Sequence, residues 1–269
     1  MSRCRVSPAE VPSPMPVRPS RSCRTTPQEA PLVLPTAGLA VDLSVEELRA
    51  RLKNVPNDET VRPYAVTTVR IRKNIFLQTG SAPNFAGGVV TLCTCKHQMR
   101  GNYNIEQWTS GVWVVGLTSM SESPGKDQNL YYLMRVSRAY ESHAELVAGL
   151  QASGQQSVVD AKAASRHRLG DILLPLKHDL AGEVRFSPAS YEKPMLGHVH
   201  RSEEYDSYWH KDVDYAGRAN RPPLLIGDPE LSFVWTNPLV KRRHSSAIRD
   251  YEKWTLSHLI SQLDNGVAA

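Results

Sequence analysis

Two apolar segments, residues 113–118 and 130–137, constrain the fold more than any other part of the chain. The first reads Trp-Val-Val-Gly-Leu-Thr and the second Leu-Tyr-Tyr-Leu-Met-Arg-Val-Ser. β-Branched and aromatic residues favour strands, and the polar residues between the two segments include Pro124-Gly125, a turn signal. The two segments are therefore predicted to pair as a β-hairpin.

A polar cluster ends the strand predicted just before this hairpin. Residues 92–100 read Leu-Cys-Thr-Cys-Lys-His-Gln-Met-Arg, so a thiol, a hydroxyl, an imidazole and two cations follow an apolar run. Binding pockets often combine an apolar wall with a few polar groups of this kind, and Lys and Arg both bind phosphate or base edges. The ligand-binding candidates here are Thr94, Cys95, Lys96 and Arg100. A solvated strand end is the competing interpretation.

The composition bounds the class of protein. With 269 residues, 41% hydrophobic and 22% charged, the chain fits a soluble globular protein with a substantial core. The net charge of +5 is compatible with a polyanionic partner without requiring one. No apolar run is long enough to predict a membrane span. Two of the four cysteines form C-x-C, which matches neither a zinc nor a redox motif, and no secretory signal is evident, so a reduced cytoplasmic protein is expected.

The chain divides into four predicted regions. Eight of the nineteen prolines and five arginines fall in residues 1–40, which favours a disordered leader. Ser44 and Glu47 form a capping box that starts a short helix. The regions are the leader at 1–40, a helix and linker at 41–60, the main domain at 61–240 and a C-terminal helix at 241–269.

The expected fold class is α+β: a curved, mostly antiparallel sheet with the C-terminal helix packed on it. Ser142 is the expected N-cap of a helix over 142–150, and residues 152–164 are expected to be an exposed helix or a mobile insert. Further strands are predicted at 64–71, 89–95, 170–175, 224–226 and 231–235, and the final helix at 245–263.

Histidines later in the chain are candidates for acid–base chemistry. His198 and His200 form H-x-H, which on a strand places both imidazoles on one face, and Asp212 could orient one of them as a general base. The spacing matches no metal motif of known geometry, so neither a metal nor another cofactor is expected. Structural loop histidines are the competing interpretation.

Aromatic and basic side chains complete the candidate ligand-binding set. Trp113 and Trp209 are candidate stacking platforms for a base, with Arg135 and His210 as polar contacts. The alternative is that these aromatic side chains anchor segments to the core. For Trp113, in the middle of an apolar strand, a largely buried ring is expected.

Several blocks of this sequence resemble the second of the nucleotide-modification-associated domain families. The blocks are Pro83-Asn84-Phe85, Gly88, Thr91-Leu92, Thr94-Cys95-Lys96, Arg100, the G-x-W-V-V-G run at 111–116 and the strand 132–136, continuing through Gly170-Asp171-Ile172, the 198–212 region and Phe233-Val234-Trp235. The resemblance covers residues 63–238. One departure is Val112, where the family pattern has Asp.

The resemblance implies a setting more than a reaction, because members of this family occur with phage and bacterial systems that make hypermodified DNA bases. The G-x-W-V-V-G strand is also similar to small barrels of the PUA and EVE type, which bind modified or flipped bases. The primary hypothesis is a binding module for a modified nucleobase or nucleotide, with DNA or the nucleotide as partner. The alternatives are an enzyme with a histidine general base and a structural partner in a modification or defence complex.

Overall fold

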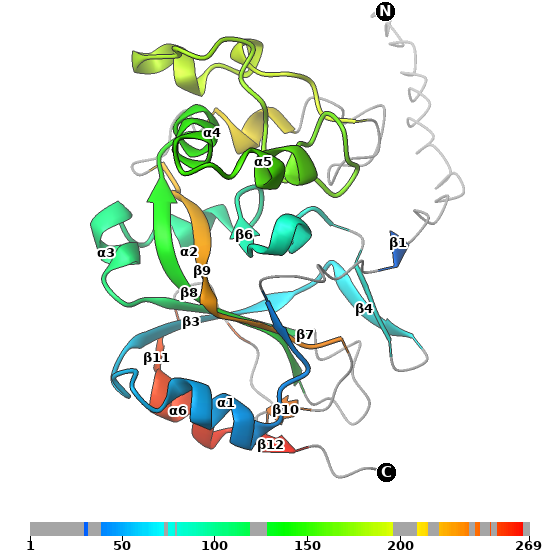
Figure 1. The fold of residues 1–269 in the computed structure, drawn as a ribbon, viewed down its shortest axis with the longest axis vertical. Helices are drawn as coiled ribbons and strands as arrows, with labels where there is room; N and C mark the ends of the chain where they lie inside the picture. Colours follow the sequence, from blue (N-terminus) through cyan, green and yellow to red (C-terminus); the bar gives the residue numbers. More distant parts are fainter. Residues whose placement is uncertain are drawn as a thin grey trace, which may run out of the picture.

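The fold is known from a computed structural model of the chain (Figure 1). The structure describes residues 30–31, 39–72, 75–78, 80–118, 128–195, 209–214, 221–236, 240–242, 248 and 252–265. In this part of the chain the architecture is α+β, with a nine-stranded sheet and a three-stranded sheet.

The predicted hairpin is confirmed and forms the centre of the large sheet. Strand β7 (Trp113–Thr118) is antiparallel to β8 (Gln128–Tyr140), with Trp113 opposite Arg135. Every residue of β7 is buried. The register shifts after Gly116, and a Cβ atom at Gly116 would lie 2.3 Å from the ring of Tyr132. The glycine therefore provides the space in which the Tyr132 ring packs across the sheet.

Strands on both sides of the hairpin complete the large sheet, which is mostly antiparallel. Two pairings are parallel, β3 with β7 and β2 with β9. The other strands of this sheet are β2 (Ala40–Val41), β3 (Thr60–Val66), β6 (Thr91–Leu92), β9 (Leu224–Val234), β10 (Val240–Arg242), β11 (Trp254–Thr255) and β12 (Leu263–Asn265). The strand path runs from β11 to β12 without joining its ends, so the described sheet is open and is not a closed barrel of the PUA or EVE type.

Several predicted strands differ in the structure. The strand predicted at 89–95 is reduced to β6, and the one predicted at 170–175 is wrong, because this segment forms only isolated bridges at Ile172 and Pro175. The run expected at 64–71 is divided by a turn at residues 67–68, so β3 belongs to the large sheet and β4 (Val69–Arg72) to the small one. β4 pairs with β5 (Ile75–Gln78), which pairs with β1 (Ala30–Pro31). Conversely, the pieces expected at 224–226 and 231–235 are continuous in β9.

The predicted leader is described only at its two short strands. β1 pairs with β5, and Ala40–Val41 pairs with β9 in parallel. The boundary proposed at residue 40 therefore falls inside a paired strand, while residues 1–29 and 32–38 lie outside the described part of the chain.

Local capping signals correctly locate two helices. Helix α1 (Val45–Leu52) begins after Ser44 with the complete capping box, and α4 (His143–Ala152) begins after Ser142, whose hydroxyl accepts from the amide of Glu145. α5 (Gln156–Lys162) corrects the expectation of an exposed helix or mobile insert, because Val158, Val159 and Lys162 are buried. Shorter helices are α2 (His97–Arg100), α3 (Ile105–Thr109), η1 (Ala86–Gly88), η4 (Gly182–Phe186) and η5 (Pro188–Ser190).

The C-terminal helix expected over residues 245–263 is shorter in the structure, and residues 245–247 and 249–251 of that range lie outside the described part of the chain. The described helix is α6 (Leu256–Ser261), which starts after the N-cap Thr255 and lies between strands β11 and β12. The hydroxyl of Thr255 accepts a hydrogen bond from the backbone amide of His258 at 3.1 Å. Leu256 and Leu259 are buried, and α6 packs against β3, so a C-terminal helix does cover the sheet.

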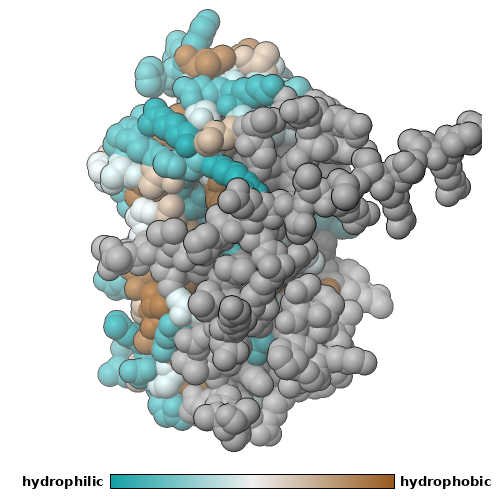
Figure 2. All heavy atoms as spheres, turned by 90° about the vertical axis from the view of Figure 1, so that its right-hand side faces the viewer, coloured by the Kyte–Doolittle hydropathy of each residue, from teal (hydrophilic) through white to brown (hydrophobic). Residues whose placement is uncertain are grey.

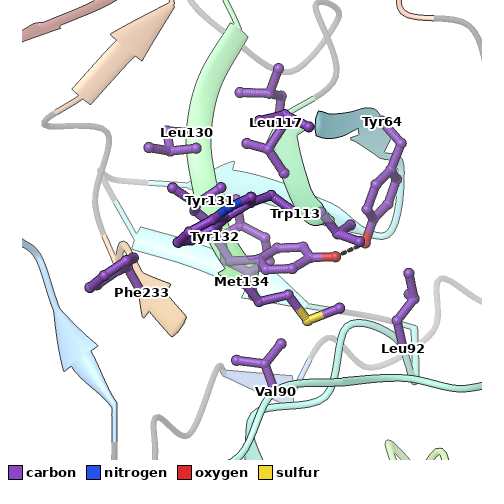
Figure 3. Packing of buried hydrophobic residues seen from close by; sticks show 14 of the residues in the cluster. Tyr64, Val90, Leu92, Trp113, Leu117, Leu130, Tyr131, Tyr132, Met134 and Phe233 are labelled. Atoms are coloured by element: carbon purple, nitrogen blue, oxygen red, sulfur yellow. Dashed lines mark hydrogen bonds between the residues drawn. The ribbon is translucent and has the colours of Figure 1, made fainter. Parts of the chain in front are cut away.

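The main core lies around the β7–β8 hairpin. Figure 3 shows Tyr131, Tyr132, Met134 and Phe233 gathered there, with the hydroxyl of Tyr132 directed at that of Tyr64. These side chains are almost completely buried. A second cluster joins α4 and α5 to the start of β9 through Leu146, Val159 and Ile226, among others.

The described helices include none that is long and apolar enough to cross a membrane. Figure 2 shows that the described upper surface of one face is mostly hydrophilic, with small apolar areas.

Candidate functional site

The polar cluster predicted after the second strand forms a tight turn, which we call the 94–97 turn. It follows β6 and leads into α2. At its base, the buried hydroxyls of Thr94 and Ser81 are 2.6 Å apart. The backbone of Lys96 has φ +58° and ψ 38°, the left-handed conformation that residues other than glycine adopt at an energetic cost. Non-glycine residues held in such conformations are concentrated at functional sites.

Arg100 holds this turn from inside the protein. Its side chain is fully buried, and Nε donates to the carbonyl oxygen of Cys95 at 2.7 Å. Nη1 donates to the carbonyl oxygens of Pro222 and Pro223, which precede β9. Arg100 is therefore not an exposed cation, and its guanidinium connects the turn to the large sheet.

Lys96 lies over an aromatic ring. Its Nζ is 5.2 Å from the centroid of the Tyr64 ring, a distance at which a cation is attracted to the face of the ring. The hydroxyl of Tyr64 accepts from that of Tyr132 at 2.9 Å. The side chain of Lys96 is half-buried, so the ammonium group lies at the boundary between the core and solvent.

The adjacent His97 pairs with Asp212. Nε2 of His97 is 2.9 Å from Oδ1 of Asp212, with side-chain exposures of 17% and 0%. An ionised carboxylate only accepts, so Nε2 donates and a neutral imidazole carries its lone pair on Nδ1. Asp212 was predicted to partner His198 or His200, which lie outside the described residues. In the structure, the histidine that pairs with Asp212 is therefore His97, the imidazole of the polar cluster.

Cys95 lies at the centre of these charges. Burial raises the pKa of its thiol to about 12; the charge of Asp212 acts in the same direction, and those of Arg100 and Lys96 in the opposite one. The thiol is therefore protonated near neutral pH. Since the thiolate is the reactive form of cysteine, the environment of Cys95 is poorly suited to nucleophilic catalysis.

Trp113 and Arg135 share a carboxylate away from this turn. Trp113 is fully buried, and its Nε1 donates to Oε2 of Glu59 at 2.5 Å. Arg135 donates to the same carboxylate from Nε at 3.0 Å and also from Nη2. The burial contradicts a stacking role for Trp113 and confirms the expectation of a core ring. The charge of Arg135 is balanced within the protein.

Trp209 and His210 lie next to Asp212 in a short helical turn. Trp209 is 7% exposed and packs in a cluster with Leu173, Tyr191 and Val213, which contradicts its predicted stacking role. His210 is exposed, with its ring centroid 4.4 Å from that of Trp209. Trp209 thus anchors its short segment to the core, and Asp212 of the same segment contacts the 94–97 turn through His97.

A second group of buried polar side chains was not predicted from the sequence. Nζ of Lys162 donates to the carbonyl and side-chain oxygens of Asn84, and Thr91 donates to Oδ2 of Asp171 at 2.8 Å. Burial lowers the pKa of Lys162 to about 8 and raises that of Asp171. These residues are almost fully buried, and their hydrogen bonds connect the segment before η1 with α5, and β6 with the loop that carries Asp171.

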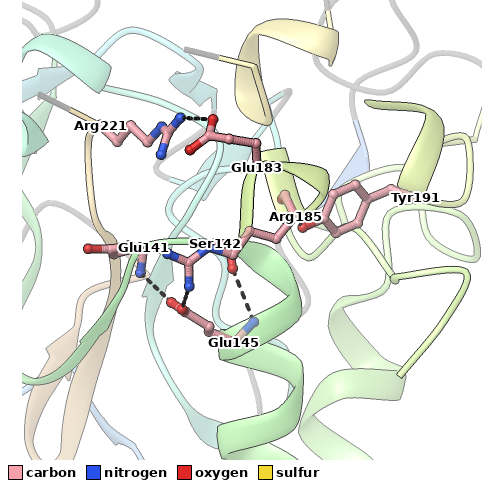
Figure 4. Close-up of polar contacts among 7 residues, drawn as sticks. All are labelled: Glu141, Ser142, Glu145, Glu183, Arg185, Tyr191 and Arg221. Atoms are coloured by element: carbon pink, nitrogen blue, oxygen red, sulfur yellow. Dashed lines mark hydrogen bonds and ion pairs between the residues drawn. The ribbon is translucent and has the colours of Figure 1, made fainter. Parts of the chain in front are cut away.

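A third polar cluster lies at the start of α4 (Figure 4). Arg185 pairs with Glu141 and Glu145, and Arg221 pairs with Glu183. These cations are matched by carboxylates, so the cluster fixes the loop around η4 and is not the best candidate for a ligand site. In the part of the chain that the structure describes, no group of three or more His, Cys, Asp or Glu side chains could hold a metal ion.

Comparisons with known proteins give no match: no family model, no curated protein and no solved structure is significantly similar to this chain. The 94–97 turn is the candidate functional site, because Thr94, Cys95 and Lys96 come together there with His97, Arg100, Asp212 and Tyr64.

Proposed function

We propose that the protein binds a modified nucleobase or nucleotide, free or carried by DNA, at the 94–97 turn. The observation that carries the proposal is the conformation of Lys96, a cation on a left-handed backbone with its ammonium group over Tyr64. Such a strained residue persists only where the surrounding structure fixes it. A lysine is a point-charge binder of phosphate, and the neighbouring His97 is oriented by Asp212.

The T-C-K block at residues 94–96 is also part of the resemblance to a nucleotide-modification-associated family. That resemblance supplies the proposed setting, a bacterial or phage-related system of DNA modification in the cytoplasm. Binding is favoured over covalent catalysis at this turn because the Cys95 thiol has a pKa of about 12 and is not activated.

The experiment is a binding titration with DNA that carries a bulky modified base, with unmodified DNA of the same sequence, and with free nucleotides. We expect Lys96→Gln to weaken binding and to flatten its salt dependence by about one unit of slope for one lost phosphate contact. Lys53→Gln is the matched control, since Lys53 is an exposed lysine at the end of α1. Equal loss of affinity in both variants, or no binding by the wild type, contradicts the proposal.

The His97–Asp212 pair favours a second candidate, an enzyme that processes the bound nucleotide. A carboxylate that accepts from Nε2 leaves Nδ1 as the basic nitrogen, the arrangement of a histidine general base. In this candidate, His97 takes the role that the sequence suggested for His198 or His200. His97→Gln separates the two functions: an enzyme keeps affinity and loses turnover, whereas a binding module loses affinity and shows no product in either form.

A further inference from the structure

Arg100 has one nitrogen without a hydrogen-bond partner. Nε donates to the Cys95 carbonyl and Nη1 to Pro222 and Pro223, but Nη2 is buried and bonds to nothing. A buried donor on a charged group normally has a partner, because water that solvated it in the unfolded chain has been removed. Because this donor belongs to the candidate site, its lack of a partner requires an explanation.

The planar guanidinium fixes the direction in which Nη2 points. Nε–H and one Nη2–H lie on the same edge and point the same way, the fork with which arginine grips two acceptors. Arg135 uses this edge to hold both oxygens of Glu59. On Arg100 the same edge faces the 94–97 turn, with the Cys95 carbonyl on Nε and the position beside it, on Nη2, without a hydrogen-bond partner.

We propose that a phosphate oxygen of the ligand occupies this place and accepts from Nη2 of Arg100. The inference depends on the proposed function and specifies the ligand: a nucleotide with a terminal phosphate monoester, as in a free 5′-nucleotide or a 5′-phosphorylated DNA end. Arg100 then has two roles, holding the turn through Nε and recognising phosphate through Nη2.

The charges around Cys95 favour a monoester over an internal phosphodiester. Arg100 and Lys96 both act on the thiol as cations. Of the two carboxylates that also act on it, Asp212 is paired with His97 and Asp171 accepts from Thr91. A phosphodiester carries one negative charge, whereas a phosphate monoester carries about −1.5 to −2 near neutral pH. Two cations beside carboxylates that already have partners match the dianion better.

Entry of the phosphate requires the turn to open locally, since Nη2 has no contact with solvent. The residue that Nε holds, Cys95, is partly exposed, and the next residue, Lys96, has a strained backbone. Release of Lys96 from its left-handed conformation would partly offset the cost of opening. The site is therefore closed in the free protein and opens when the ligand binds.

The test compares ligands that differ only in the phosphate. One pair is a modified-base oligonucleotide with a 5′-phosphate or a 5′-hydroxyl, and the other is each common 2′-deoxynucleoside 5′-monophosphate and its methyl ester. The wild type is expected to bind each monoester at least about tenfold more tightly than its counterpart, the difference expected for a hydrogen bond to a charged group. Arg100→Lys should remove most of this preference while keeping the charge.

The control is Arg62→Lys, because Arg62 is another buried arginine, on β3 over the Tyr103 ring. It should lose stability without losing the preference for the monoester. If both ligands of each pair bind the wild type equally, the inference is wrong and the proposed function stands. If no nucleotide or DNA binds, the proposed function fails. If Arg100→Lys does not fold, the wild-type comparison still decides.

Discussion

Nε2 of His97 lies 2.9 Å from Oδ1 of Asp212, although 115 positions separate the two residues in the chain. The contact brings the short turn at 209–212, anchored by Trp209, onto the 94–97 turn. It places a carboxylate that is inaccessible to solvent beside Cys95 and gives His97 a fixed orientation.

Replacing Asp212 with Asn should make Cys95 more acidic. The charge of Asp212 raises the pKa of the thiol, so its removal should lower that pKa from about 12. Burial is the larger cause and remains, so the pKa should stay above the ordinary value of 9.0. The measurement is the rate of Cys95 alkylation against pH, read by peptide mass spectrometry.

Asp160→Asn is the control for this experiment, because Asp160 pairs with Arg166 on the surface and does not act on Cys95. An unchanged alkylation profile in Asp212→Asn would show that the carboxylate is too far from the thiol to influence it.

Lys96→Gly should be more stable than Lys96→Ala, although both remove the same side-chain contacts. The φ of +58° is costly for alanine and free for glycine, so we expect a difference of about 0.5–1 kcal/mol in the free energy of unfolding. Chemical denaturation of the two variants measures it. Both should lose ligand affinity, and equal stability would mean that the backbone of Lys96 is not strained.

Local signals in the sequence predict the parts of the fold that depend on neighbouring residues. The caps at Ser44 and Ser142 and the β7–β8 hairpin are all set by residues close together in the chain. The C-terminal helix was predicted too long because its apolar spacing is also compatible with strands β11 and β12, which form only by pairing with distant β3 and β10.

The candidate site could be located from the sequence, but not its interactions. The cluster of Thr94, Cys95 and Lys96 was evident from residue types, whereas nothing local distinguishes a buried Arg100 from an exposed one. The partner of Asp212 depends on tertiary packing, and His200 was an equally plausible choice from spacing alone. Burial of Trp113 followed from its position in an apolar strand.

Stability between pH 7 and pH 9.5 should rise in the wild type relative to Lys162→Met. Burial lowers the folded-state pKa of Lys162 from 10.5 to about 8, so the unfolded chain holds this proton more tightly. The resulting penalty is complete below pH 8 and disappears as pH rises towards 10.5, which favours the folded protein by about 1–3 kcal/mol. Denaturation midpoints at several pH values give the difference.

The comparison with Lys162→Met is needed because buried thiols and phenols titrate in the opposite sense at high pH. Burial raises the pKa values of Cys93 and Tyr64, so their contribution to stability is lost as pH rises past the unfolded values of 9.0 and 10.0. A pH-independent difference between wild type and Lys162→Met would mean that Lys162 is not desolvated.

Trp113→Ala should destabilise the protein by about 3–5 kcal/mol, the usual cost of truncating a large aromatic side chain in a core. Trp113→Phe, which keeps most of the packing but loses the bond to Glu59, should cost about 1–2 kcal/mol. Chemical denaturation measures both. Full stability of Trp113→Ala with loss of ligand affinity would instead identify this ring as a stacking platform.

Ligand binding at the 94–97 turn can be tested with a ¹⁵N spectrum of the histidine side chains recorded during a nucleotide titration. His97→Gln assigns the signals of His97, and His258 of α6 provides the internal reference. We expect the signals of the two ring nitrogens of His97 to shift as a 5′-phosphorylated nucleotide binds, while those of His258 stay in place. A nucleotide that binds without moving the signals of His97 would place the ligand site elsewhere.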